Sequence, residues 1–328
     1  MRITVLSGGV GGARFTRGLL AMLRDRLPDG AGGTTAQVTV VANTGDDMWL
    51  HGVRVCPDLD TLMYTLGDAV HEGQGWGRRD ETSRVSGDLA AYGLGWEWFT
   101  LGDLDLATHL ARTQLLQEGL TLSQVTERLA QRWDLGVRLL PMSDQPVETH
   151  VELVDGRTVH FEEWWVRLRA GVPARSFVQA GLEVATAAPG VVEALTEADV
   201  VLLPPSNPVV SIGTILAVPG VHAALAATAA PVVGVSPVIG GAPVRGMADA
   251  CLAAIGVETS AAAVAHHYGA RSTGGILDGW LVDDADAGAV PELALAGLAA
   301  AATGTLMSDV PTTARIAAAA LSLVDRLP

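Results

Sequence analysis

Directly after a short apolar segment, Ile3–Leu6, the chain has a turn with glycine at four of five positions: Gly8, Gly9, Gly11 and Gly12. Helical apolar spacing follows in Ala13–Arg26, and Val38–Ala42 is a second strand-like segment. This order predicts a βαβ unit whose glycines let backbone N–H groups approach a phosphate at the positive end of a helix. We expect the turn to hold a nucleotide diphosphate. The alternative is that the glycines only let strand and helix pack closely.

The strand-like segments are almost wholly apolar, which is typical of parallel sheets covered on both faces. We therefore predict an α/β chain with a Rossmann-like three-layer core and a mainly parallel sheet, built from residues 1–72 and 172–328. Residues 73–171 differ, because six of the eight tryptophans fall there: Trp76, Trp96, Trp98, Trp133, Trp164 and Trp165. Helical spacing and a hairpin pattern in this range predict a partly helical insertion that acts as a lid.

Two features limit the choice of nucleotide. The second predicted strand ends in Val41-Ala42-Asn43, whereas an NAD site favours an acidic residue there to hold the ribose. All 21 basic residues are arginine, so a Walker-type P-loop lysine and a Schiff-base lysine are both excluded. The net charge of −15 argues against nucleic acid as a partner, because phosphate binding needs a basic face.

The chain also has features that bear on its compartment. Its least charged stretch, residues 200–244, is divided by prolines into pieces shorter than the roughly 18 apolar residues of a membrane span. Its two cysteines, Cys56 and Cys251, form neither a disulfide framework nor a zinc spacing. We expect a cytoplasmic protein without membrane contact.

Four aspartates, Asp46, Asp47, Asp58 and Asp60, are predicted to lie in loops just after the second strand. In doubly wound sheets, ligands bind at this edge. Carboxylates next to a phosphate would repel it unless a cation lay between them, and Mg²⁺ typically takes one or two carboxylates. The alternative is a solvated acidic loop.

A third loop, Pro204–Gly213, follows another apolar strand and contains Ser206, Asn207, Pro208 and Ser211. These residues suit a nucleotide, but Ser211 could equally act as a helix cap. His109 could be catalytic or a satisfied helix histidine. The pair Trp164-Trp165 could stack on a flat heterocycle or pack in the core.

Several long blocks together resemble the 2-phospho-L-lactate transferase family, which makes the deazaflavin coenzyme F-420. They are GGVGGARF (8–15), NTGDDMWLHGVRVCPDLDTLMYTLGD (43–68), LGDLDLATH (101–109), LPMSDQPVETHV (140–151), PPSNPVVSIGTIL (204–216) and SPVIGGAPVRGMAD (236–249). The resemblance runs nearly end to end. The wording, with EEWWVR at 162–167, looks most like the actinobacterial branch, described as phosphoenolpyruvate transferase.

The resemblance implies a Mg²⁺-dependent, homodimeric enzyme that moves an enolpyruvyl (or lactyl) phosphate from a guanosine diphosphate donor to the ribityl hydroxyl of the deazaflavin Fo, releasing GMP. By motif, the glycine turn and Ser206, Asn207, Pro208 and Ser211 would bind the nucleotide, and Asp46, Asp58 and Asp60 the metal. Asp60 would also be catalytic and would bind the deazaflavin with Thr100 and His109. Thr100 stands where relatives often have a basic residue. Two alternatives are a nucleotide-sugar-binding regulatory protein of the same superfamily and a nicotinamide oxidoreductase.

Overall fold

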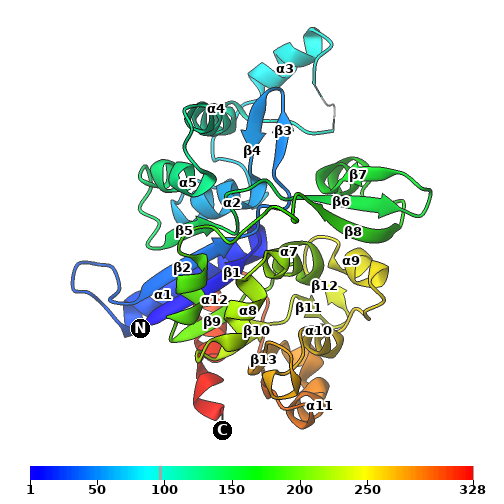
Figure 1. Cartoon of the computed structure of the whole chain (residues 1–328). Helices are drawn as coiled ribbons and strands as arrows, with labels where there is room; N and C mark the ends of the chain where they lie inside the picture. Colours follow the sequence, from blue (N-terminus) through cyan, green and yellow to red (C-terminus); the bar gives the residue numbers. More distant parts are fainter. Residues whose placement is uncertain (96–97, 328) are drawn as a thin grey trace.

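A seven-stranded sheet forms the centre of the computed structural model, which describes residues 1–95 and 98–327 (Figure 1). Every strand pair in it is parallel. The strands lie in the order β14 (Ala299–Ala302), β13 (Gly279–Val282), β10 (Val232–Val235), β9 (Val200–Leu203), β1 (Arg2–Ser7), β2 (Gln37–Ala42) and β5 (Arg138–Pro141). The predicted mainly parallel α/β core is confirmed. Trp96 lies outside the described residues.

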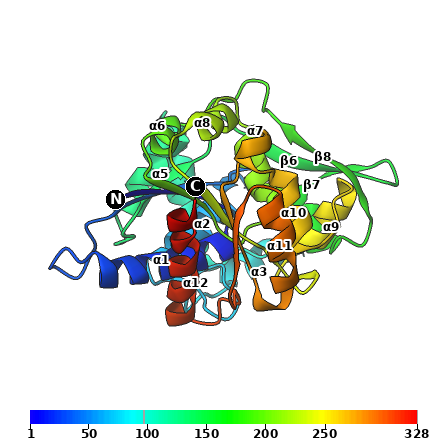
Figure 2. The same cartoon turned by 90° about the horizontal axis from the view of Figure 1, so that it is seen from below.

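Side chains alternate between the two faces of this sheet, so each strand contributes to two cores. Val5 and Val40 belong to one apolar cluster, whereas Leu6 and Val41 belong to the other. The first cluster is covered by α1 (Val10–Arg26), α2 (Pro57–Leu66) and α12 (Val310–Ser322). The second is covered by α6 (Val191–Thr196), α7 (Gly213–Ala217), α8 (Val221–Ala227), α10 (Ala261–Tyr268) and α11 (Val290–Leu295). Figure 2 shows α1 and α12 on one side of the sheet and α6 and α8 on the other.

Smaller elements outside the central sheet complete the fold. They comprise the hairpin β3–β4 (Met48–Leu50, Val53–Val55), the helices α3 (Arg84–Ala91), α4 (Asp103–Gln117) and α5 (Leu122–Ala130), and an antiparallel sheet in the order β7 (Thr158–His160), β6 (Glu148–Leu153), β8 (Ala174–Ala180). A π-helical turn at Glu163–Arg167 follows β7, and β11 (Val238–Ile239) and β12 (Ala242–Pro243) precede α9 (Ala248–Ala254). The predicted hairpin is confirmed, and β8 adds a third strand to it.

The boundary of the insertion differs from the predicted 73–171. Strand β5 lies inside that range but pairs with β2 in the central sheet. Conversely, β8 lies in the predicted core range but pairs with β6. The sequence gives little sign of β5, because only Leu139 and Leu140 mark this short strand, and each packs on a different face.

Two helices begin earlier than expected, and both starts affect the site. Helix α1 begins at Val10 rather than Ala13, so Gly11 and Gly12 lie in its first turn. Helix α2 begins at Pro57, a residue suited to the first helical position. Asp58 and Asp60 are therefore helical, not in a loop as predicted.

No single helix of the described chain is long and apolar enough to cross a bilayer. The pair Pro208–Ala217 and Val221–Ala227 meets the length and composition criteria only jointly, with a bend of 87°. Both members pack in the second of the two apolar clusters described above.

Candidate functional site

One cavity of about 1200 Å³ opens at the carboxyl ends of β1, β2, β9 and β10. The chain proceeds outward from β1 to β2 and β5 in one direction and from β9 to β14 in the other. This reversal of strand order creates the crevice in which doubly wound sheets bind ligands. The cavity is lined by most of the site residues expected from the sequence: Gly8, Gly9, Gly11, Asp46, Asp58, Asp60, Thr100, His109, Ser206, Asn207 and Ser211. The fold therefore brings most of the expected residues together.

The glycine turn is tightly enclosed by the other loops. A Cβ on Gly8 would lie 2.6 Å from Oγ of Ser211, and a Cβ on Gly9 or Gly11 would collide with Asp58 or with the carbonyl of Pro205. None of these glycines has a positive φ, so close approach is what requires glycine here. The packing alternative raised from the sequence is thus real, and it coexists with a turn that faces the cavity.

Two predicted nucleotide residues lie outside the cavity lining. Gly12 faces Oγ of Ser7 from the first turn of α1. Pro208 is buried at the first position of the helical turn that follows Asn207. Both residues lie where a helix begins, and their contact with a nucleotide stays a prediction.

Asn207, not Ser211, caps the helical turn. Its Oδ1 accepts hydrogen bonds from the N–H groups of Val209 (2.9 Å) and Val210 (3.2 Å), and its Nδ2 donates to Sγ of Cys251 (3.4 Å). The Asn207 amide is therefore already engaged. Oγ of Ser206 accepts a hydrogen bond from the N–H of Gly8 (3.1 Å), which ties this loop to the glycine turn.

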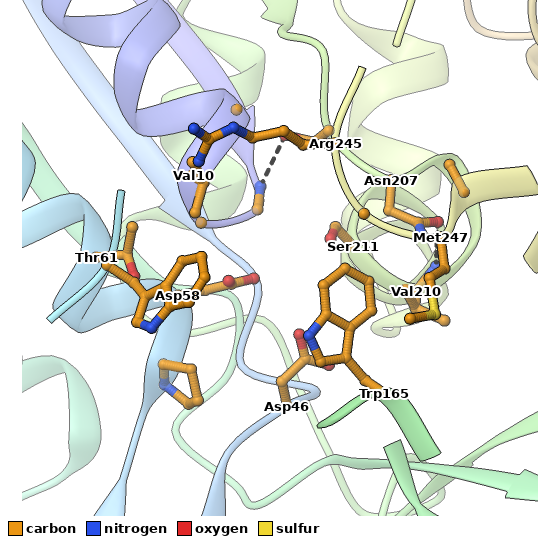
Figure 3. A pocket seen from close by; sticks show the side chains of 18 of the residues that line it. Val10, Asp46, Asp58, Thr61, Trp165, Asn207, Val210, Ser211, Arg245 and Met247 are labelled. Atoms are coloured by element: carbon orange, nitrogen blue, oxygen red, sulfur yellow. Dashed lines mark hydrogen bonds between the residues drawn. The ribbon is translucent and has the colours of Figure 1, made fainter. Parts of the chain in front are cut away.

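Asn43, just after β2, joins Asp46 and Asp58 in one cluster. Its Nδ2 donates to Oδ2 of Asp58 at 2.9 Å and to Oδ2 of Asp46 at 3.2 Å. Its Oδ1 accepts from the N–H of Gly45 at 2.9 Å, which fixes the orientation of the amide. Figure 3 shows both carboxylates at the cavity, with Asp58 on the side of Val10.

Glu162 joins this cluster, although the sequence analysis did not select it as a site residue. It lines the same cavity and is largely buried. Burial raises its pKa to about 8, with a further contribution from Asp58. In the sequence, Glu162 is part of a Glu-Glu pair before two tryptophans. Nothing in that pattern indicates that it lies near Asp58, about 100 residues earlier in the chain.

The pKa values of the two aspartates respond to the same crowding. Burial, followed by repulsion from Asp58 and Glu162, raises the pKa of Asp46 well above its usual range. Burial raises the pKa of Asp58 to about 6, although hydrogen bonds from Asn43 and from the N–H of Gly9 oppose the increase. The burial of these carboxyl groups and the repulsion between them favour a shared proton or a cation at this place.

These residues fit a divalent cation. Oδ1 of Asp46 is buried and has no hydrogen-bond partner among the described residues. Carboxylate oxygens are the ligands that Mg²⁺ prefers, with water and phosphate oxygens in the remaining positions. Asp46, Asp58 and Glu162 could hold such an ion beside the glycine turn.

Asp60 lies in a different cluster from Asp46 and Asp58. The guanidinium of Arg112, on α4, donates a hydrogen bond from Nη2 to its Oδ1. Nδ1 of His109 lies 3.5 Å from its Oδ2, and Asp105 lies beyond the histidine, with Oδ1 3.6 Å from Nε2. Asp60, Asp105 and His109 have ligand atoms within 4.8 Å of one another, but the cationic Arg112 at the same carboxylate disfavours a metal ion there.

Contacts of Arg112 also determine the state of His109. Nη1 of Arg112 lies 3.2 Å from Nδ1 of the imidazole, and a guanidinium can only donate. Nδ1 therefore accepts, and the imidazole proton is on Nε2, on the side of Asp105. Burial raises the pKa of Asp60 above its ordinary value, and the charge of the Arg112 guanidinium opposes this increase. The histidine is 1% exposed and lines the cavity, and its catalytic role stays a prediction.

The fourth aspartate, Asp47, is buried and does not line the cavity. Its Oδ2 lies 3.8 Å from Nη2 of Arg54. Nη1 of the same arginine donates a hydrogen bond to Oε1 of Glu148 at 2.9 Å. Arg54 in turn accepts, through its backbone carbonyl, a hydrogen bond from Arg112 (3.2 Å). These contacts connect Asp47 and Arg54 to Arg112, the partner of Asp60.

Aromatic side chains cover the rest of the cavity. Trp165 lines it, and its ring contacts the backbone at Gly246; Figure 3 shows the indole pointing into the open space. Its neighbour Trp164 is fully buried and donates to the carbonyl of Val172 at 2.8 Å. The two alternatives for this pair therefore separate, with Trp164 in the core and Trp165 at the site. Trp76 and Phe99, next to Thr100, line the cavity as well.

Comparison with known proteins identifies the family of this chain. The family model described as 2-phospho-L-lactate transferase CofD matches residues 3–312. A Streptomyces coelicolor protein named phosphoenolpyruvate transferase is 58% identical over 330 residues, covering 100% of this chain and 99% of its own. Proteins of the same name from Thermobifida fusca (58% over 326 residues) and Mycobacterium sp. strain KMS (53% over 331 residues) each match over 98% of both chains.

A crystal structure of a Bacillus halodurans protein has a TM-score of 0.62 at 17% identity, over 98% of this chain and 99% of that one. At this identity the likeness supports the fold alone. The family match and the long, highly similar relatives support more. The chain therefore belongs to the 2-phospho-L-lactate transferase family and is a transferase.

Proposed function

We propose that the protein transfers a phosphoenolpyruvyl group, or a 2-phospholactyl group, from a guanosine diphosphate-linked donor to the ribityl hydroxyl of the deazaflavin Fo. The hydroxyl oxygen attacks the β-phosphorus, the bond from this phosphorus to the bridging oxygen breaks, and GMP leaves with that oxygen. The product is dehydro-coenzyme F-420-0, or coenzyme F-420-0 from the lactyl donor. One observation carries the proposal: the glycine turn and a buried carboxylate cluster line the same cavity, with Asp58 directly against Gly9.

This juxtaposition makes chemical sense with Mg²⁺. We assign the ion to Asp46 and Asp58, with Glu162 beside them, because of the unpartnered Oδ1 of Asp46 and the repulsion within the cluster. When bound, the ion supplies positive charge for the phosphoryl oxygens. The chain has no lysine that could supply this charge instead.

Asp60 is proposed to act on the acceptor hydroxyl rather than on the ion. Arg112 engages its Oδ1, whereas its Oδ2 is buried without a hydrogen-bond partner among the described residues. A carboxylate oxygen held in this way can orient the hydroxyl and accept its proton as the new P–O bond forms. The resemblance implies both a metal ligand and a catalytic residue at Asp60, and the contact with the cationic Arg112 favours the catalytic role.

The deazaflavin is proposed to lie against the aromatic wall. Trp76, Phe99 and Trp165 offer flat surfaces for a tricyclic ring, and Thr100 lies beside Phe99. Since His109 is almost fully buried, its contribution is to the position of Asp60 more than to direct contact with the ring.

The deciding experiment is incubation with Fo, Mg²⁺ and each of the two donors, with the product identified by mass. We expect GMP and a product that contains Fo joined through one phosphate to the three-carbon acid. Absence of this product with both donors, from folded protein, would refute the proposal.

Thermal shift separates the two alternatives retained from the sequence. GDP with Mg²⁺ should raise the melting temperature, whereas NADPH and a UDP-sugar should not. Stabilisation by NADPH alone would favour the oxidoreductase, and stabilisation by a UDP-sugar alone would favour the regulatory protein. We further propose that the protein is cytoplasmic and forms a homodimer. Light scattering at assay concentration tests the dimer.

A further inference from the structure

Two arginines lie together at the rim of the cavity, on the side of the glycine turn. Arg14 is on α1, one turn after Val10, and Arg245 is in the segment between β12 and α9. A Cβ on Gly75 would be 3.1 Å from Nη1 of Arg245 and 3.6 Å from Nη2 of Arg14. The two guanidinium groups are therefore neighbours across the backbone of Gly75.

Neither arginine is neutralised by the protein. Among the described residues, no carboxylate oxygen lies within 4.0 Å of either guanidinium. Glu72, whose charge partly raises the pKa of Arg14, accepts its side-chain hydrogen bonds from Arg17, at 2.6 Å and 3.2 Å. Burial and the charge of Arg245 together lower the pKa of Arg14. Two adjacent like charges that face a cavity favour an anionic ligand.

Among the described residues, the hydrogen bonds of Arg14 and Arg245 leave most of their N–H donors unused. Nη1 of Arg245 donates to the carbonyl of Gln74 at 3.0 Å, and Nη2 of Arg14 makes a long contact, 3.5 Å, with the carbonyl of Glu72. These bonds to neutral acceptors orient the two side chains around the loop at Gly75. Each guanidinium has five N–H donors, so several remain free for a ligand.

The position of the pair suggests which anionic group it meets. The acidic cluster lies elsewhere in the cavity: in Figure 3, Arg245 is next to Val10 and Asp46 is at the opposite end of the view. A diphosphate on the glycine turn and the cation would occupy the space near Asp58. A second anionic group on the same ligand would then reach the arginines, and a planar guanidinium matches the geometry of a carboxylate.

We propose that Arg14 and Arg245 bind the carboxylate of the three-carbon acid on the donor, and so select an acid-bearing diphosphate ester over GDP and its neutral esters. This inference rests on the proposed function for the identity of the ligand. It assigns a specificity site for a carboxylate, separate from the residues that face the diphosphate.

The test uses two GDP esters that differ in one group: the 2-lactyl ester, which carries the carboxylate, and the isopropyl ester, in which a methyl group replaces it. Calorimetry with Mg²⁺ gives the Kd of each ester for the wild type and for Arg14→Gln, Arg245→Gln and the double variant. The matched control is Arg169→Gln, because Arg169 also lines the cavity but is exposed. Melting temperatures confirm that each variant is folded.

The wild type should prefer the lactyl ester by roughly 10- to 100-fold, which is the range for charge-assisted hydrogen bonds. The double variant should lose this preference while its Kd for the isopropyl ester changes little, and Arg169→Gln should keep the preference. Equal weakening of both esters would assign the arginines to the diphosphate and overturn the proposal. An unchanged preference in the double variant, or none in the wild type, would also overturn it.

Transfer to Fo, followed by mass on the same samples, separates this inference from the proposed function. Arginine-dependent preference without any product would refute the transfer reaction and leave the carboxylate site standing. Product formation by a wild type that does not distinguish the two esters would refute the carboxylate site alone.

Discussion

The guanidinium of Arg112 donates a hydrogen bond to the carboxylate of Asp60, and both side chains are at least 95% buried. The two residues come from different helices, α4 and α2. Their pairing fixes one oxygen of Asp60 and leaves the other toward His109 and the cavity. The protein's own Arg112 therefore supplies the positive charge that keeps the Asp60 carboxylate at the site.

Replacing Arg112 with methionine should destabilise the fold strongly, since it leaves the Asp60 carboxylate buried without its partner. Loss of one member of a buried ion pair typically costs about 3–5 kcal/mol. Urea unfolding measures the change. Arg128→Gln, an exposed change on α5, is the control, and a loss below about 1 kcal/mol for Arg112→Met would contradict the buried pair.

Asp60→Asn should remove most of the turnover while leaving nucleotide binding intact. General-base contributions are typically about 10²- to 10⁴-fold in rate, and GMP release should fall within that range. The thermal shift with GDP and Mg²⁺ should remain, because Asp60 is apart from the Asp46–Asp58 cluster. If turnover persists, Asp60 is not catalytic; if the shift with Mg²⁺ disappears, Asp60 is a metal ligand after all.

Asp46→Asn should have opposite effects with and without metal. In the metal-free protein it relieves repulsion with Asp58 and Glu162, so the melting temperature should rise. With GDP present, the extra stabilisation by Mg²⁺ should shrink, since a ligand oxygen has lost its charge. Asp25→Asn, on the exposed end of α1, is the control and should change neither quantity. A metal-free Asp46→Asn protein that is less stable than wild type would argue against a repulsive cluster.

Stability without metal should depend on pH through Glu162. Its pKa is raised from 4.5 to about 8, so between these values the folded protein retains a proton that the unfolded chain has released. The folded state then binds more protons, and stability falls as pH rises through this window, by up to about 1.4 kcal/mol per pH unit for one group. Below pH 4.5 both states are protonated, and above about pH 8 the penalty is complete.

The difference in unfolding free energy between wild type and Glu162→Gln isolates this dependence. We expect Glu162→Gln to gain stability relative to wild type as pH increases from 5 to 8, and the gain to shrink with saturating Mg²⁺ and GDP. A difference that is independent of pH would show that Glu162 titrates normally.

Much of the core could be predicted from local pattern. Apolar runs such as Val38–Ala42 and Val200–Leu203 stand out because strands buried on both faces leave little room for polar side chains. Strand β5 was missed, since two leucines inside a charged region carry no periodicity. The starts of α1 and α2 were placed too late because glycine and proline, poor residues in a helix interior, are tolerated in the first turn.

The candidate site divides in the same way. The sequence by itself determined the glycine turn, the aspartates after β2 and the Ser206–Ser211 loop, because a parallel sheet brings the ends of its strands to one edge whatever the details of packing. Only the tertiary structure decided the partners of each side chain. Asn43 joins Asp58 to Asp46, Arg112 holds Asp60 apart from them, and Glu162 and Arg245 reach the cavity from distant segments. These relationships depend on contacts between elements far apart in the chain, and local periodicity carries no record of them.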